Sequence, residues 1–233
     1  MLKPTSSFEG STLSQPETIR AYYKWHAGIY DATRWTFLFG RRQLTKQLDL
    51  AREYAGTLLE VGCGTGYNLR RLAAGYPNLF LIGVDVSPDM LQKAAASTNA
   101  YSRRVLLFEA PYAPGAFVLP KQPDVVLFSY ALTMFNPGWE AALQRAYDDL
   151  PVGGRIAVVD FHDTPNGAFR HWLEKNHVRF DGHLLPALEA RFRTVYKRVD
   201  SAYGGLWRYM SFIGEKRSAE FMSHIIDNQF VAK

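Results

Sequence analysis

Short apolar runs alternate with longer amphipathic stretches through the middle of this 233-residue chain. Runs rich in Val, Leu, Ile and Phe are typical of strands buried on both faces, and the stretches between them have the period of helices. The expected strands are 57–63, 79–86, 105–110, 124–130 and 155–161, with helices at 66–74, from Ser87 onward and at 138–150. This alternation predicts an α/β fold, a doubly wound Rossmann-like sheet that is mostly parallel.

The pattern changes after Asp163. The expected elements are two helices, at 165–176 and 184–192, and two strands, at 195–203 and 206–214, with Gly204 and Gly205 between the strands. Two glycines between strand-like segments are typical of a tight turn. We therefore expect the sheet to end in an antiparallel β-hairpin.

The N-terminal segment has a helical and aromatic pattern. Residues 1–13 are rich in Ser, Thr, Gly and Pro and are expected to form a mobile lead-in. Residues 14–17, read as SQPE, form a capping box that predicts a helix running to about Phe39, and a second helix is expected over 41–54. The chain is divided into an N-terminal segment with a helical lid (1–52), a core (53–216) and a C-terminal tail (217–233).

The stretch EVGCGTGYN, residues 60–68, has glycines at 62, 64 and 66. Alternate glycines fit a tight strand-to-helix turn to whose backbone a ligand comes close. Their spacing differs from the dinucleotide fingerprint, and no Gly-Lys-Ser/Thr follows as in a phosphate-binding loop. Asp85 lies nineteen residues beyond Gly66, at the end of the next expected strand, where its carboxylate can accept both hydroxyls of a ribose. The alternative is a generic turn with a solvated acid.

The motif E-x-G-C-G-T-G, followed by Gly83, Asp85, Ser87 and Met90 in the pattern G-x-D-x-S-x-x-M, resembles the class I S-adenosylmethionine-dependent methyltransferases. The resemblance covers about residues 16–216 and implies S-adenosylmethionine as the cofactor. In that family the glycine turn packs against the methionine part and the acid at the position of Asp85 holds the ribose. The implied cofactor-binding residues are Glu60, Gly62, Gly64, Asn68, Asp85, Val86, Met90, Glu109, Ala110 and Ser129.

The resemblance also implies a role for each strand end. Glu60 and Asn68 would hold the methionine amino group, and Val86 and Met90 would sandwich the adenine. Where the family commonly has Asp-Ala, this chain has Glu109-Ala110, so that Glu109 would accept the adenine N6 amine and the Ala110 N–H would meet N1. The fourth expected strand ends in Ser129-Tyr130-Ala131-Leu132, the position nearest the methyl group to be transferred.

A narrower resemblance starts from Ile29-Tyr30-Asp31-x-x-Arg34. Together with Cys63, Asn68 and Ser129-Tyr130, this segment is similar to the bacterial betaine-lipid N-methyltransferases, which methylate a diacylglyceryl-homoserine amine. It implies a lid in which Tyr30 and Arg34 cover the cofactor, and Tyr22 on the same expected helix is a further candidate for binding the cofactor. The acceptor would then be the amine of a lipid headgroup or small molecule. The alternatives are O- or N-methylation of another soluble metabolite and a non-catalytic cofactor-binding module.

The candidate catalytic residues are Tyr30, Tyr130 and His177. Methyl transfer from a sulfonium depends on positioning and on exclusion of water. Tyrosine faces attract the sulfonium and a quaternary ammonium product, and a histidine can remove the proton of an amine. The alternative is that the tyrosines pack the core and that His177 is structural. No metal site is predicted, because strand alternation points adjacent residues such as His162 and Asp163 to opposite faces, so that Asp160, His162 and Asp163 do not all share one face.

The net charge is +5, and residues 1–52 carry eight basic and four acidic residues, or +4 of it. A basic N-terminal face is typical of contact with an anionic membrane or an acidic ligand, although a solvated face is the simplest interpretation. Nucleic acid is not expected, because the fourth strand lacks the Asn/Asp-Pro-Pro-aromatic tetrapeptide common in enzymes that methylate base amines. The single Cys63 excludes an internal disulfide, and no signal peptide or long apolar segment is present. We expect a cytoplasmic protein, peripheral at the inner membrane face if the acceptor is a lipid, and no oligomeric state is predicted.

Overall fold

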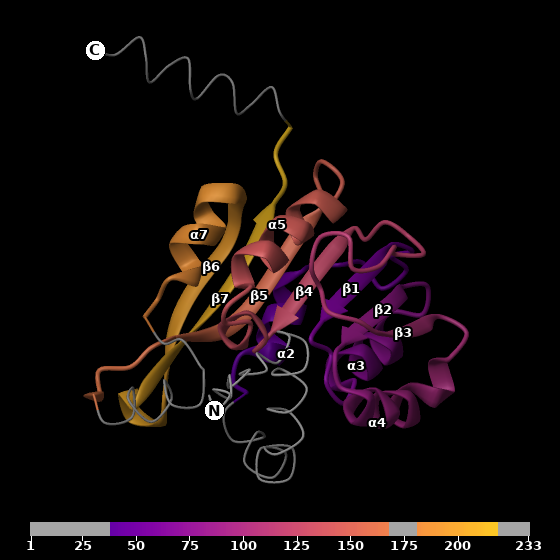
Figure 1. The fold of residues 1–233 in the computed structure, drawn as a ribbon, viewed down its shortest axis with the longest axis horizontal. Helices are drawn as coiled ribbons and strands as arrows, with labels where there is room; N and C mark the ends of the chain where they lie inside the picture. The colour runs from indigo at the N-terminus through magenta and orange to yellow at the C-terminus, as the bar shows by residue number, and fades with distance from the viewer. Residues whose placement is uncertain (1–37, 168–180, 219–233) are drawn as a thin grey trace, which may run out of the picture. The chain divides into compact units, whose positions relative to one another are not determined.

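The computed structural model describes residues 38–167 and 181–218. Within them one seven-stranded sheet has the order β3-β2-β1-β4-β5-β7-β6 (Figure 1). The strands are β1 (Thr57–Val61), β2 (Phe80–Asp85), β3 (Val105–Glu109), β4 (Val125–Ser129), β5 (Arg155–Asp163), β6 (Arg193–Ala202) and β7 (Trp207–Glu215). Neighbours among the first five strands pair in parallel, and β7 is antiparallel to both β5 and β6. The predicted sheet with a C-terminal hairpin is confirmed.

The helices cover both faces of this sheet. The described α-helices are α2 (Arg41–Gln47), α3 (Tyr67–Gly75), α4 (Pro88–Thr98), α5 (Trp139–Asp149) and α7 (Leu184–Arg191). Figure 1 shows α3 and α4 beside the half of the sheet that holds β1, β2 and β3, and α7 beside the hairpin. On the α5 and α7 face, alternate strand residues such as Leu59, Val126 and Met210 join one buried core with Leu143 and Leu188. Each such side chain contributes roughly 1.5–3 kcal/mol by leaving water.

The start of α4 follows from local sequence. Ser87 accepts a hydrogen bond from the Met90 N–H at 3.4 Å, and Pro88 occupies the first helical position. A serine cap satisfies an N–H that the helix cannot, and proline has its φ already set for the first turn. The predicted capping by Ser87 is therefore confirmed.

The helix expected over 41–54 is shorter, and this prediction was wrong. Helix α2 ends at Gln47, and Asp49 takes a left-handed conformation with φ 47°. A left-handed residue cannot continue an α-helix, and Asp is one of the few residues other than glycine that adopt it. The Arg155 guanidinium donates to the carbonyl of Leu48 at 3.0 Å, which stabilises this end.

Helix α2 packs against the sheet. Leu44 and Leu48 are fully buried, and Gly40 lies where an added Cβ would be 2.6 Å from the Tyr209 ring. The compact unit that holds the sheet begins at Leu38, and the expected division of the chain at residue 53 stays a prediction. The expected N-terminal lid over 1–37, most of helix 165–176, and tail residues 219–233 lie outside the described residues. No helix in the described part is long and apolar enough to cross a bilayer.

Candidate active site

The glycine turn lies at the carboxyl end of β1. The N–H groups of Gly62 and Cys63 both donate to the Val84 carbonyl, at 2.8 and 3.1 Å, and this ties the turn to β2. Gly62 has φ 67° and Gly66 has φ 74°. A Cβ on Gly66 would be 3.1 Å from the Ala94 backbone, so this glycine also lets α3 pack against α4. The strand expected to reach residue 63 therefore ends at Val61.

Asp85 joins the end of β2 to the glycine turn. One oxygen of its carboxylate accepts the Gly64 N–H at 2.8 Å, and the other accepts the Ser87 N–H at 3.0 Å. Two backbone donors fix the orientation of the carboxylate at the carboxyl edge of the sheet. A carboxylate oxygen accepts more than one hydrogen bond, so this geometry is compatible with ribose hydroxyls as further donors.

Glu60 and Asn68 lie together beneath the turn. The Asn68 amide donates to one Glu60 carboxylate oxygen at 2.7 Å, and both side chains are buried. Asn68 is in the first turn of α3, and no described side chain caps the N-terminus of that helix. The structure thus brings together the two residues that were expected to hold one amino group.

Glu109 and Ala110 follow the end of β3. Glu109 is exposed and pairs in register with Asp85. The Ala110 N–H, which was expected to meet the adenine N1, donates instead to the Asp85 carbonyl at 3.1 Å. The β2–β3 ladder thus already uses this N–H, and the contact of Ala110 with the adenine N1 stays a prediction. The next residue is Pro111, which has no N–H to offer.

The remaining candidates near these strand ends differ in exposure. Met90 and Ser129 are 5% and 7% exposed, and Val86 is half-buried. Met90 is in the first turn of α4, directly after the Asp85 loop, and Ser129 is the last residue of β4.

Tyr130 follows Ser129 and is 2% exposed. Its hydroxyl donates to the Phe39 carbonyl at 2.9 Å, its ring meets the Phe161 ring edge-on at 4.8 Å, and its φ is 56°. Burial, and next the charge of Asp160, raise the pKa of Tyr130 well above its usual value. The phenol therefore stays protonated at neutral pH, which suits an aromatic wall and excludes Tyr130 as a base.

The sequence did not indicate a role for Asp160 in this site. The side chain is fully buried at the end of β5, accepts hydrogen bonds from the Thr133 N–H and hydroxyl and accepts the Phe161 N–H at 2.9 Å. Burial raises its pKa from 3.8 to about 6, although these hydrogen bonds act in the opposite direction. Asp160 thus holds the loop after β4. The sequence marked Asp160 only as a metal candidate beside His162 and Asp163, and nothing in it indicates the Thr133 partner.

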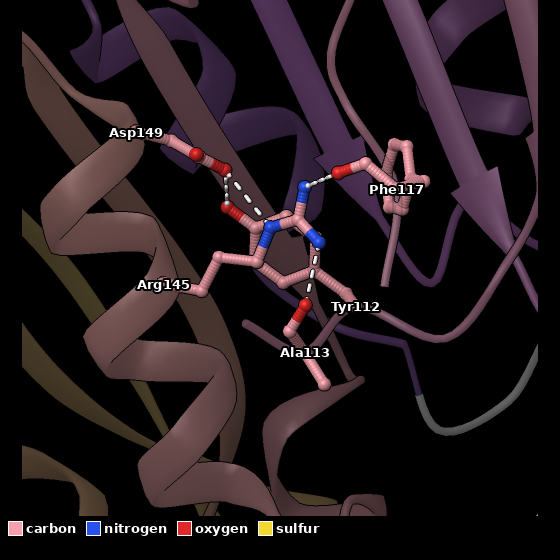
Figure 2. Close-up of polar contacts among 5 residues, drawn as sticks. All are labelled: Tyr112, Ala113, Phe117, Arg145 and Asp149. Carbon is pink, nitrogen blue, oxygen red and sulfur yellow. Dashed lines mark hydrogen bonds and ion pairs between the residues drawn. The ribbon is translucent and has the colours of Figure 1, made fainter. Parts of the chain in front are cut away.

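Arg145 was also missed. Figure 2 shows its guanidinium between two segments: it donates to the carbonyls of Ala113 and Phe117 at 2.6 and 2.7 Å, and to Asp149 at 3.2 Å. It lies 4.7 Å from the centre of the Tyr112 ring, and the Tyr112 hydroxyl donates to Asp149 at 2.8 Å. We call these five residues the Arg145 clamp. The clamp holds the segment after Ala110 against α5.

The acid-rich strand ends favour the cofactor implied by the sequence. Glu60, Asp85 and Glu109 lie at or near the ends of the neighbouring strands β1, β2 and β3. S-adenosylmethionine carries an amino group, a ribose with two hydroxyls and an adenine amine, and each is a hydrogen-bond donor. The residues present therefore fit this cofactor.

Comparison with known proteins agrees with this geometry. Residues 59–156 match the family model described as a methyltransferase domain. The demethylmenaquinone methyltransferase of Thermus thermophilus is 32% identical over 148 residues, which cover 60% of this chain and 64% of the relative. The chain thus spans less than two thirds of the length of that relative.

The matched region, residues 59–156, is thus similar to the domain of class I S-adenosylmethionine-dependent methyltransferases. The predicted enzyme class and cofactor are confirmed at the level of this domain. The N-methyltransferase NodS of Bradyrhizobium japonicum matches 77% of the chain and 97% of its own with 18% identity and a TM-score of 0.61, and it has also been solved with S-adenosylhomocysteine. The 1,6-didemethyltoxoflavin-N1-methyltransferase of Burkholderia thailandensis matches 90% of the chain and 94% of its own with 17% identity and a TM-score of 0.66. At these identities the two structures show the shared methyltransferase fold.

Several candidate residues of the methyltransferase lie outside the described residues, namely Tyr22, Tyr30, Arg34 and His177. Their roles stay predictions. Of the three neighbours considered for a metal, Asp160 is buried against Thr133 and Asp163 pairs with the Arg208 guanidinium. Burial lowers the pKa of His162.

Proposed function

We propose that this methyltransferase N-methylates an amine, either of a lipid headgroup or of a small molecule, by in-line displacement. Two of the similar structures are named as N-methyltransferases. The segments around Tyr30, Cys63 and Tyr130 resemble the betaine-lipid N-methyltransferases, which supports a lipid headgroup as the acceptor.

The strand ends would hold the cofactor. S-adenosylmethionine supplies an electrophilic methyl group on a positively charged sulfur. In this proposal Asp85 accepts the ribose hydroxyls, Glu60 and Asn68 hold the amino group, and Glu109 accepts the adenine amine. The Asp85 carboxylate is already oriented by two backbone N–H groups, so little conformational freedom is lost when a ligand binds.

The observation that carries the choice of an amine is a buried aromatic cluster beside a buried carboxylate. Tyr130 and Phe161 pack edge-on at 4.8 Å, and Phe161 contacts the Trp207 ring at 5.2 Å. The Asp160 charge is close enough to act on Tyr130. Aromatic faces and a nearby negative charge favour a cationic product such as a methylated ammonium. The protonated Tyr130 oxygen is a poor competitor for the methyl group.

The residues outside the described part complete the proposal. Tyr22, Tyr30 and Arg34 would close over the cofactor, and His177 would accept the proton of the amine. A cytoplasmic protein that attaches peripherally to an anionic inner membrane face would have access to a lipid acceptor. The proposal includes no nucleic-acid substrate, and it does not specify an oligomeric state.

A soluble metabolite is the second candidate acceptor, for O- or N-methylation. The relative from Thermus thermophilus is named for demethylmenaquinone, and it is 32% identical in the matched region. A non-catalytic cofactor-binding module is the third hypothesis; the intact glycine turn together with Asp85 argues against it.

Methyl-labelled S-adenosylmethionine separates these hypotheses. We would incubate the full chain with a total lipid extract and, separately, with a soluble metabolite pool, and follow label by mass spectrometry. The proposal expects label on an amine-containing lipid, strongly reduced in Asp85→Ala and retained in the control Asp89→Ala, which removes an exposed acid from the first turn of α4. Label only in the soluble pool would contradict the lipid acceptor, and label in neither would contradict methyl transfer.

A further inference from the structure

We infer that helices α2 and α3 present a basic face that docks onto the surface of an anionic lipid bilayer. The basic face consists of Arg41, Arg42, Lys46, Arg70 and Arg71. The inference deepens the proposed function, on which it rests for the lipid acceptor. Contact with the bilayer itself can be tested without any methyl transfer.

No acidic residue of α2 or α3 offsets the positive charge of this face. Neither α2 nor α3 contains an acidic residue, and Arg42, Lys46 and Arg70 are exposed. Within residues 38–167 and 181–218, no carboxylate forms an ion pair with any of these three. The first acid after α2 is Asp49, which follows the last turn of the helix.

Three of the arginines gather around one tyrosine. The Arg41 guanidinium lies 4.2 Å and the Arg71 guanidinium 5.7 Å from the centre of the Tyr67 ring, and Arg42 donates to the Tyr67 hydroxyl at 3.0 Å. The ring and hydroxyl partly offset the repulsion between like charges this close. An anionic surface would offset it further, so the local charge density favours negatively charged lipid.

Exposed apolar side chains lie on the same edge of the sheet. Phe39, just before α2, is 38% exposed, and Leu206, between β6 and β7, is 39% exposed. The Phe39 ring meets the Tyr203 ring at 5.4 Å, which links the start of α2 to the tip of the hairpin. Basic residues beside exposed aromatic and aliphatic ones are typical of segments that bind at the membrane interface.

The location connects this surface to the active site. Tyr67 directly follows Gly66 of the glycine turn, and Asn68 next to it contacts Glu60. The Phe39 carbonyl accepts the Tyr130 hydroxyl. A bilayer at the basic face would therefore lie beside the strand ends where a lipid headgroup has to arrive.

Co-sedimentation with vesicles tests the inference on the full chain. Phosphatidylcholine vesicles and vesicles with about 30% phosphatidylglycerol carry no primary amine, so binding is independent of methyl transfer. We expect binding to the anionic vesicles only, weakened as salt rises from about 0.1 M to 1 M because screening shortens the reach of the charges. Absence of binding would overturn the inference and leave a soluble acceptor for the proposed function.

Matched variants locate the surface. Each basic residue near an anionic membrane changes partitioning by roughly fivefold, so Arg42→Gln/Arg70→Gln/Arg71→Gln is expected to weaken binding by about a hundredfold. The control Arg103→Gln/Lys121→Gln/Arg193→Gln removes three exposed charges near the opposite edge of the sheet and should bind almost as the parent does. Phe39→Ser keeps the charge and is expected to weaken binding several-fold.

A charge-preserving variant distinguishes binding to a bilayer surface from binding of a phosphate at a discrete site. A bilayer responds to charge, so Arg42→Lys/Arg70→Lys/Arg71→Lys should retain binding, whereas a site built on guanidinium geometry would not. Loss of binding in this variant, equal loss in the control variant, or tighter binding to a single-stranded oligonucleotide than to the vesicles would each overturn the inference. Binding of S-adenosylhomocysteine by every variant serves as the check that it is folded.

Discussion

Asp160 has the most perturbed environment of any carboxylate that we describe near the strand ends. Its side chain is fully buried, and Thr133 and the Phe161 N–H hold it in place. Desolvation raises its pKa from 3.8 to about 6, so the folded protein favours the protonated acid. This group therefore adds to stability below about pH 4, and its contribution is lost as the pH rises through 6.

Asp160→Asn should remove this pH dependence, because an amide of the same shape does not ionise. We expect the difference in unfolding free energy between parent and variant to shift by roughly 2 kcal/mol in favour of the variant between pH 4 and 7. Urea denaturation at several pH values measures it. The control Asp89→Asn changes an exposed acid and should follow the parent profile. A difference that stays constant with pH would show that Asp160 is not the titrating group.

Asp85 and Ala110 show which features of the site the sequence predicts. The position of Asp85 at a strand end follows from its spacing after the glycine turn. Whether the Ala110 N–H is available depends on one further rung of the β2–β3 ladder, which the sequence does not indicate. Side chains such as Glu60 could be assigned to a strand end, whereas the use of individual backbone donors could not.

At the scale of elements, the strands begin and end within about two residues of the expected positions, because buried parallel strands read as continuous apolar runs. The end of α2 was missed, since it depends on a left-handed Asp49 and on the distant Arg155. The Arg145 clamp was missed for a related reason. Its carbonyl partners lie about thirty residues away, on a segment without regular structure.

Arg145→Ala should destabilise the attachment of the 110–119 segment to α5. The Ala113 and Phe117 carbonyls lose their donor, and Asp149 loses its ion-pair partner. We expect the free energy of unfolding to fall by roughly 3 kcal/mol, as for other broken buried pairs. Arg145→Lys keeps the positive charge but not the planar guanidinium, and we expect it to lose only part of this free energy of unfolding. Urea denaturation measures both.

Arg191→Ala is the matched control, because Arg191 ends a helix and donates to a single carbonyl of its own helix at 3.2 Å. It should cost less than about 1 kcal/mol. Equal losses in Arg145→Ala and Arg191→Ala would mean that the clamp does not hold the segment.

At the scale of the whole molecule, one sheet order explains why separate motifs meet. β1 is flanked by β2 and β4, so residues from three chain segments reach one edge beside the glycine turn. The alternation of strands and helices predicted this class of sheet, and the antiparallel β7 was expected from the Gly204-Gly205 turn. The basic face was foreseen only as an excess of charge in residues 1–52. Its extension onto α3 depends on the contact between Arg42 and Tyr67, which no local pattern encodes.

Titration calorimetry with S-adenosylmethionine tests the central claim, that the strand-end acids of this domain hold the cofactor. The account predicts one binding site in the parent protein, a loss of affinity of about a hundredfold in Asp85→Ala because two hydrogen bonds to a charged group disappear, and no change in the exposed control Asp89→Ala. Asp85→Asn keeps the side-chain volume, and its affinity should lie between those of the parent protein and Asp85→Ala. Undiminished affinity in Asp85→Ala, or no binding by the parent protein, would contradict the account.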